Sequence, residues 1–124
     1  MKKIVVVEKN PHIRSLVQRE LIAEGYTVFA PACEKELLEL FSGRQIMDLM
    51  IIDPEVLDNN FGHIAEKISA YRPDLPVIVH ALAVDKDGVV PFGSVLERIE
   101  KNWDSISELK KVTADLMKAE GRTP

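Results

Sequence analysis

The amino-acid sequence predicts a doubly wound α/β fold, in which helices cover both faces of a parallel β-sheet. Short apolar runs alternate with amphipathic helical stretches along the whole chain. The run at residues 47–53, MDLMIID, has four consecutive apolar residues and ends on a carboxylate. A strand that is apolar on both faces has to be buried on both, as in a parallel sheet. Ligands bind at the carboxyl ends of such strands, where Asp53 is expected to lie.

The composition indicates one globular domain. The chain has 124 residues, enough for one hydrophobic core, and it is 46% apolar and 29% charged. We expect a domain over residues 1–120 and a frayed tail at 121–124. A formal net charge of -4 disfavours nucleic-acid binding. The single cysteine, Cys33, suits a reducing cytoplasm, and no apolar stretch is long enough to predict a membrane span.

The first half of the chain carries clear strand and helix signals. Residues 4–7 are β-branched and apolar, which predicts a buried first strand. Asn10 suits the N-cap of the following helix, Pro11 suits its first turn, and Gly25 suits its end. A second strand, a second helix and the central strand are then predicted at residues 26–30, 34–41 and 47–53.

The second half is less regular. Turn residues predict a loop directly after Asp53. A third helix follows around residues 64–71, and a fourth strand is predicted at residues 75–80. Two glycines and a proline within residues 84–93 oppose a regular helix, so we expect a short or irregular fourth crossover. Residues 95–99 fit a fifth strand or a helical turn. Asp104 or Ser105 would cap the last helix, with Ser105 and Glu108 at capping-box spacing.

Three segments in this order, KKIVVVEKNPHIRSLV, MDLMIID and RPDLPVIV, resemble the receiver domains of two-component response regulators, including those of chemotaxis. The resemblance covers almost the whole chain. It implies a five-stranded sheet of order 2-1-3-4-5 with five helices, here with a degenerate fourth helix. It also implies a cytoplasmic signalling protein rather than an enzyme. Asp53 would accept a phosphoryl group from a histidine kinase or phosphotransfer protein, with Mg²⁺ as the metal, and would signal to an unknown downstream protein.

The resemblance assigns roles to residues at the carboxyl edge of the sheet. Glu8 stands for the first of two adjacent acids, Asp53 is the phospho-acceptor, and Glu55 would offer its backbone carbonyl to the metal. Lys9 stands where the second acid is expected, so an ammonium replaces a direct metal ligand, which counts against Mg²⁺ binding. Ala81 stands at the position of the switch threonine or serine and lacks the hydroxyl.

Two registers exist for the lysine that receiver domains carry on the fifth strand. Matching the sequence VPF at Val90 leaves only nine residues after Ala81, too few for a helix and a strand. Matching Lys101 leaves twenty, so Lys101 is the predicted residue. Arg98 then falls where the aromatic switch residue is usual.

Lys9 leaves two function hypotheses open. The chain is a phosphorylatable receiver, or it is a pseudo-receiver, a binding module that keeps the fold without Mg²⁺-dependent phosphorylation. We expect Lys9 to lie within ion-pairing reach of Asp53. Partner recognition is expected over residues 95–118, in a monomer or weak homodimer. A flavodoxin-like cofactor binder is disfavoured, because no glycine-rich turn follows the first strand.

The histidines favour structural roles. His80 lies on the fourth predicted strand, where a hydrogen-bonded core histidine is the favoured interpretation. His12 and His63 fall at helix starts, and the three are too dispersed to predict a zinc site.

Overall fold

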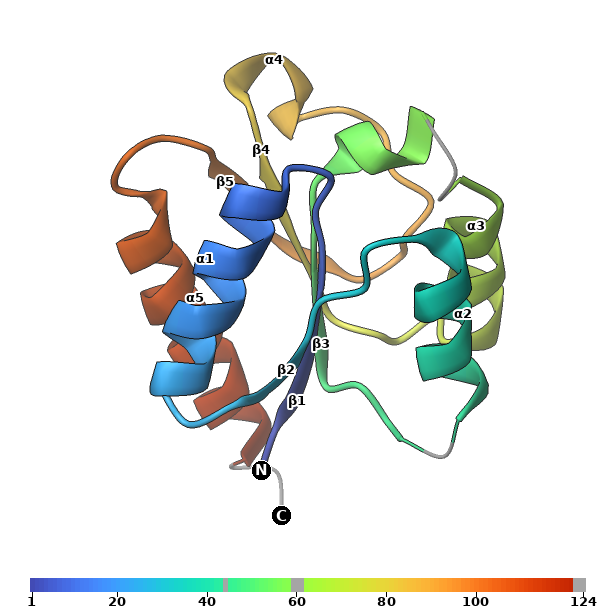
Figure 1. The fold of residues 1–124 in the computed structure, drawn as a ribbon, viewed down its shortest axis with the longest axis horizontal. Coiled ribbons are helices and arrows are strands. Elements are labelled where there is room, and N and C mark those ends of the chain that lie inside the picture. The colour runs from blue at the N-terminus through green and yellow to red at the C-terminus, as the bar shows by residue number, and fades with distance from the viewer. Residues whose placement is uncertain (44, 59–61, 122–124) are drawn as a thin grey trace.

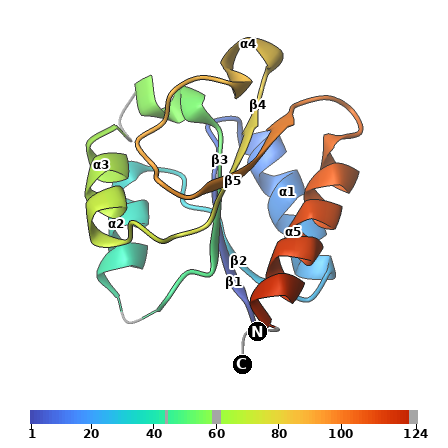
Figure 2. The ribbon, with the colours of Figure 1, turned by 180° about the vertical axis from the view of Figure 1, so that it is seen from behind.

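The computed structural model describes residues 1–43, 45–58 and 62–121 and contains one five-stranded parallel sheet of order β2-β1-β3-β4-β5. This is the order that the resemblance implied. Helices α1 and α5 cover one face of the sheet, and α2 and α3 cover the other (Figures 1 and 2). The strands are β1 (Lys3–Val7), β2 (Thr27–Phe29), β3 (Leu49–Ile52), β4 (Val77–Ala81) and β5 (Val95–Glu100). The helices are α1 (Pro11–Ala23), α2 (Glu34–Ser42), the short 3-10 helix η1 (Pro54–Asp58), α3 (Gly62–Tyr71), α4 (Ala83–Lys86) and α5 (Ser105–Gly121).

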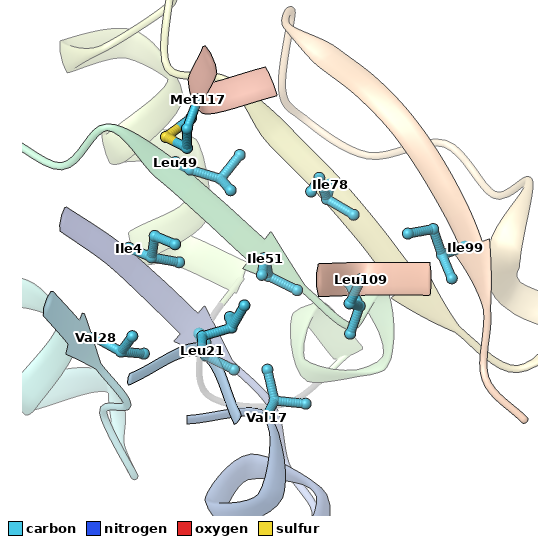
Figure 3. Close-up of a cluster of buried hydrophobic side chains, with 11 residues drawn as sticks. Ile4, Val17, Leu21, Val28, Leu49, Ile51, Ile78, Ile99, Leu109 and Met117 are labelled. Atoms are coloured by element: carbon cyan, nitrogen blue, oxygen red, sulfur yellow. The ribbon is translucent and has the colours of Figure 1, made fainter. Parts of the chain in front are cut away.

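The central strand β3 anchors both layers of the core. Leu49 and Ile51 pack in the cluster that includes α1 and α5, shown in Figure 3, and Met50 and Ile52 pack in the cluster that includes α2 and α3. Full burial of such a side chain contributes about 1.5–3 kcal/mol. The ladder continues one step further, since the Asp53 N–H donates to the Val7 carbonyl at 3.0 Å. Asp53 therefore lies on a rigid support.

The predicted signals around α1 are confirmed. The Asn10 side chain accepts hydrogen bonds from the backbone N–H groups of His12 at 2.9 Å and Ile13 at 3.1 Å. Pro11 begins the helix, where its missing N–H removes no intrahelical bond. Gly25 follows the helix with φ of 100°, a conformation that a Cβ atom disfavours. These caps fix where the chain leaves β1.

The irregular second half is partly as predicted. Helix α4 has only four residues, which confirms the degenerate fourth crossover, and residues 95–100 form a strand rather than a helical turn. The predicted loop after Asp53 instead contains η1, while residues 59–61 lie outside the described residues. Helix α5 extends to Gly121, and the rest of the predicted frayed tail also lies outside them. Within the described part of the chain, no helix is long and apolar enough to cross a membrane.

The capping box expected at Ser105 and Glu108 is wrong. The Ser105 hydroxyl donates to the Asn102 carbonyl at 2.9 Å and lies 2.9 Å from Nε2 of His80. A buried imidazole needs a hydrogen-bond partner, and the partner of His80 is the Ser105 hydroxyl that would otherwise cap the helix. The start of α5 is therefore tied to β4 instead of to its own first turn.

Candidate functional site

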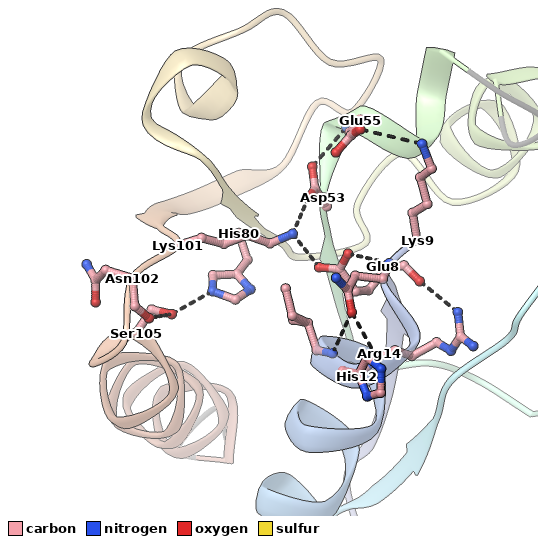
Figure 4. Close-up of polar contacts among 12 residues, drawn as sticks. Glu8, Lys9, His12, Arg14, Asp53, Glu55, His80, Lys101, Asn102 and Ser105 are labelled. Atoms are coloured by element: carbon pink, nitrogen blue, oxygen red, sulfur yellow. Dashed lines mark hydrogen bonds and ion pairs between the residues drawn. The ribbon is translucent and has the colours of Figure 1, made fainter.

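Three charged side chains meet at the carboxyl edge of the sheet. Glu8 follows β1, Asp53 follows β3 and Lys101 follows β5, and parallel strands bring these ends to one edge (Figure 4). Glu8 and Asp53 are buried, with 6% and 3% of their surface exposed. Three residues that are far apart in the sequence therefore form one buried cluster.

Lys101 holds the two acids together. Its Nζ lies 2.6 Å from Oε1 of Glu8 and also donates to Oδ2 of Asp53. Burial alone would lower the pKa of Lys101, but the hydrogen bonds to Asp53 and Glu8 and their charges outweigh it, so the pKa is raised. Lys101 is therefore a cation at neutral pH.

The other carboxylate oxygens also have partners. Oε2 of Glu8 accepts from the Asn10 N–H at 3.0 Å, and Oδ1 of Asp53 accepts from the Glu55 N–H at 2.9 Å. With the two bonds from Lys101, all four oxygens are engaged by protein donors. The charge of this acidic pair is thus compensated by the chain itself.

Arg14, which the sequence did not single out, supports this cluster from α1. Its Nη1 donates to the backbone carbonyl of Glu8 at 3.0 Å. Arg14 falls within the Pro-x-Ile-Arg helix start of the first matching segment, but only the fold shows that its side chain turns back to β1. The bond fixes the backbone from which Glu8 and Lys9 project.

The expected ion pair between Lys9 and Asp53 is wrong. Nζ of Lys9 lies 3.6 Å from Oε1 of Glu55, and the Lys9 side chain is 58% exposed. Lys101 occupies the position against Asp53 that Lys9 was expected to take. Lys9 instead lines a cavity of about 460 Å³, whose lining also includes Glu8, Glu55 and Lys101. The cavity thus opens between two ammonium groups and two carboxylates.

Ala81 and His80 lie at the end of the neighbouring strand β4. Ala81 is fully buried, and its carbonyl accepts from the Lys101 N–H at 2.7 Å. His80 is also buried and lies against Ser105, which confirms the predicted core histidine. Because the Ser105 hydroxyl donates to Asn102, we assign the proton of His80 to Nε2. Burial, followed by the charge of Lys101, lowers the pKa of His80 to about 4.

The residues that would hold Mg²⁺ do not fit the ion. Mg²⁺ requires about six oxygen ligands in near-ideal octahedral geometry. Among the described residues, no group of three His, Cys, Asp or Glu side chains could hold a metal. Lys101 bridges Glu8 and Asp53, and Lys9 places a second ammonium beside Glu55. Mg²⁺ would have to displace these two ammonium groups from the carboxylates, so the residues as arranged do not fit the ion.

No protein-family model matches the chain, and no curated protein matches it. Solved structures do. The response regulator TrrA from Thermotoga maritima, in complex with Mg²⁺ and BeF, is 29% identical over 94% of this chain and 99% of its own, with a TM-score of 0.74. TrrA in complex with the histidine kinase ThkA is 28% identical over 94% and 98%, with a TM-score of 0.70.

A third structure supports the same fold. It is a response regulator receiver domain protein from Clostridium thermocellum, 18% identical over 98% of both chains, with a TM-score of 0.77. Like both TrrA structures, it matches over nearly its full length. The sheet order and these full-length matches show that the chain has the receiver-domain fold, and its buried cluster of two acids and a lysine adds to its similarity to response-regulator receiver domains.

Proposed function

We propose that this receiver domain acts in a two-component phosphorelay and that Asp53 accepts a phosphoryl group from a histidine kinase or phosphotransfer protein. The ammonium of Lys101 against Oδ2 of Asp53 is the observation that carries the proposal. A carboxylate oxygen attacks phosphorus, the O–P bond forms, and the bond from phosphorus to the donor histidine nitrogen breaks. The product bears extra negative charge next to Lys101, which stabilises it. The complex of TrrA with its kinase supports a kinase partner.

We infer a signalling role in the cytoplasm rather than catalysis on a separate substrate, and a monomer or weak homodimer. We propose that a downstream protein binds to β5 and α5, residues 95–118. Leu96 and Trp103 are exposed there, and Val84 and Val89 are exposed nearby after β4. Exposed apolar side chains in one region favour a protein-binding surface.

Intact mass after treatment with acetyl phosphate tests phosphorylation. The expected result is a gain of one phosphoryl group in the wild type and none in Asp53→Asn. Gain in both proteins would place the modification elsewhere. No gain in the wild type, with or without Mg²⁺, would reject Asp53 as an acceptor from this donor.

The pocket geometry also favours a second candidate, a pseudo-receiver that binds partners without Mg²⁺-dependent phosphorylation. Two observations support this candidate. Lys9 forms an ion pair with Glu55, and every carboxylate oxygen of Glu8 and Asp53 already accepts a hydrogen bond or ion pair from the protein. Calorimetric titration of Mg²⁺ should show weak or no binding in the wild type and measurable binding in Lys9→Asp, which restores an acid. Millimolar or tighter affinity in the wild type, unchanged by the substitution, would contradict this candidate.

A further inference from the structure

Arg98 forms hydrogen bonds from β5 to α4 and to the turn after it. Its Nη1, projecting from β5, donates to the carbonyl of Lys86 at 2.6 Å and to the carbonyl of Gly88 at 2.9 Å. Lys86 is the last residue of α4, and Gly88 lies just beyond it. Carbonyls at a helix C-terminus lack intrahelical donors, and a cation there is also attracted to the negative end of the helix dipole. One guanidinium therefore serves two acceptors of α4 and the turn after it.

The α4 segment contributes little to the hydrophobic core. A helix of four residues is not stable by itself, and α4 contributes no buried side chain. Val84 and Val89 are 88% and 99% exposed. Among the described residues 83–94, the apolar side chain that packs against the core is the partly buried Phe92. Tertiary contacts must fix the segment, and Arg98 supplies two of them.

Residue 81, which lies between Asp53 and this segment, has no side-chain group that could form a hydrogen bond to a modified Asp53. Strand β4 ends at Ala81, whose methyl group offers no hydrogen bond to a modified Asp53. The next residue, Leu82, caps α4 without a side-chain hydrogen bond. The hydrogen bond given above between this strand end and Lys101 uses the backbone carbonyl of Ala81, which is already part of the sheet. A change of charge at Asp53 therefore cannot be transmitted to α4 through a hydrogen bond of the side chain of residue 81.

We propose that Arg98 is a clamp that fixes α4 against β5, so that the face formed by these elements keeps one arrangement whatever the chemical state of Asp53. The inference rests on the proposed function only in taking this face as part of the partner surface. The clamp itself is a property of the fold. The clamp keeps the face of α4 and β5 in one arrangement, which we call preset, whereas an ordinary receiver switch would rearrange this face.

Amide hydrogen exchange of residues 83–94 tests the clamp without any kinase or partner. Arg98→Met keeps the length and apolar stem of the side chain but removes its donors. Loss of two hydrogen bonds should speed exchange in this segment by about tenfold or more, with the central strands unchanged. Arg98→Lys, which keeps a cation and donors, should retain part of the protection. The matched control is Arg19→Met, because Arg19 is an exposed arginine on α1.

Asp53→Asn supplies the second half of the test. If the face is preset, this variant exchanges like the wild type at residues 83–94. Unchanged protection in Arg98→Met would reject the clamp, and faster exchange in Asp53→Asn equal to that of Arg98→Met would reject a preset face. The result is independent of the phosphodonor experiment, so a failure of phosphorylation and a failure of the clamp are separately visible.

Discussion

His80 is the residue whose ionisation the surroundings oppose most clearly. Its ring is buried on β4, and Lys101 places a positive charge near it, while Asp53 partly offsets that charge. The folded-state pKa is about 4, below the ordinary value of 6.5. The hydrogen bond to Ser105 positions a neutral ring. His80 therefore links the stability of the domain to pH.

We predict that stability falls as the pH drops from about 6.5 towards 4. The unfolded state binds a proton more readily than the folded state in this range, so acid favours unfolding, and stability from His80 is fully present only above the unfolded pKa. Between pH 7 and pH 5 the loss should be about 2 kcal/mol. Urea unfolding at both pH values measures it, and His80→Gln should remove most of the difference. An equal pH dependence in both proteins would show that other groups cause it.

At the scale of elements, α5 contains a polar atom that the fold leaves without a partner. Thr113 is fully buried, and its hydroxyl has no hydrogen-bond partner among the described residues. A buried hydroxyl without a partner costs about 1–3 kcal/mol. Valine has nearly the same shape and no such group.

We predict that Thr113→Val stabilises the domain by about 1 kcal/mol, because it removes a desolvated hydroxyl without opening a cavity. Thermal and urea unfolding measure the change. Thr27→Val is a useful control, since the Thr27 hydroxyl on β2 is partly exposed and contacts the Met1 sulfur at 3.6 Å. A lower stability of Thr113→Val would indicate a hydrogen bond that the buried hydroxyl makes in solution.

The elements also show which features a sequence can predict. Strand β3 and the caps of α1 depend on neighbouring residues, so consecutive apolar residues and the Asn10–Pro11 pair were sufficient to place them. The contact of His80 with Ser105 depends on where two distant segments meet. No local pattern encodes that meeting, and the local capping-box spacing therefore gave a wrong prediction.

The same distinction applies to the site. The resemblance to receiver domains, together with the interval from Ala81 to Lys101, was enough to predict that Glu8, Asp53 and Lys101 belong to one site. Side-chain direction was not predictable, and Lys9 turns to Glu55 instead of Asp53. The two carbonyls bound by Arg98 were equally invisible, since they depend on the path of an irregular segment.

At the scale of the whole molecule, exposed apolar residues on β5 and after it predict where a partner binds. Leu96 is half-exposed, and Trp103 is 95% exposed. Once a kinase or downstream protein has been isolated, Leu96→Ala and Trp103→Ala should each weaken its binding by about tenfold, because large apolar side chains dominate interface energies. Calorimetry or surface binding measures the change. Ile46→Ala, at another exposed apolar residue before β3, should bind like the wild type, and equal effects of all three would contradict a localised surface.

The bridging position of Lys101 has a consequence for biosynthesis. The ribosome releases β1, β3 and β4 before β5, and these three are neighbours in the sheet. A nascent chain that pairs them early brings the carboxylates of Glu8 and Asp53 to one edge before their shared cation has emerged. Docking of the last strand brings Lys101 between them and relieves their mutual repulsion. The final quarter of the chain therefore completes the charge balance as well as the sheet, and a truncated chain would be left with a mutually repelling acidic edge.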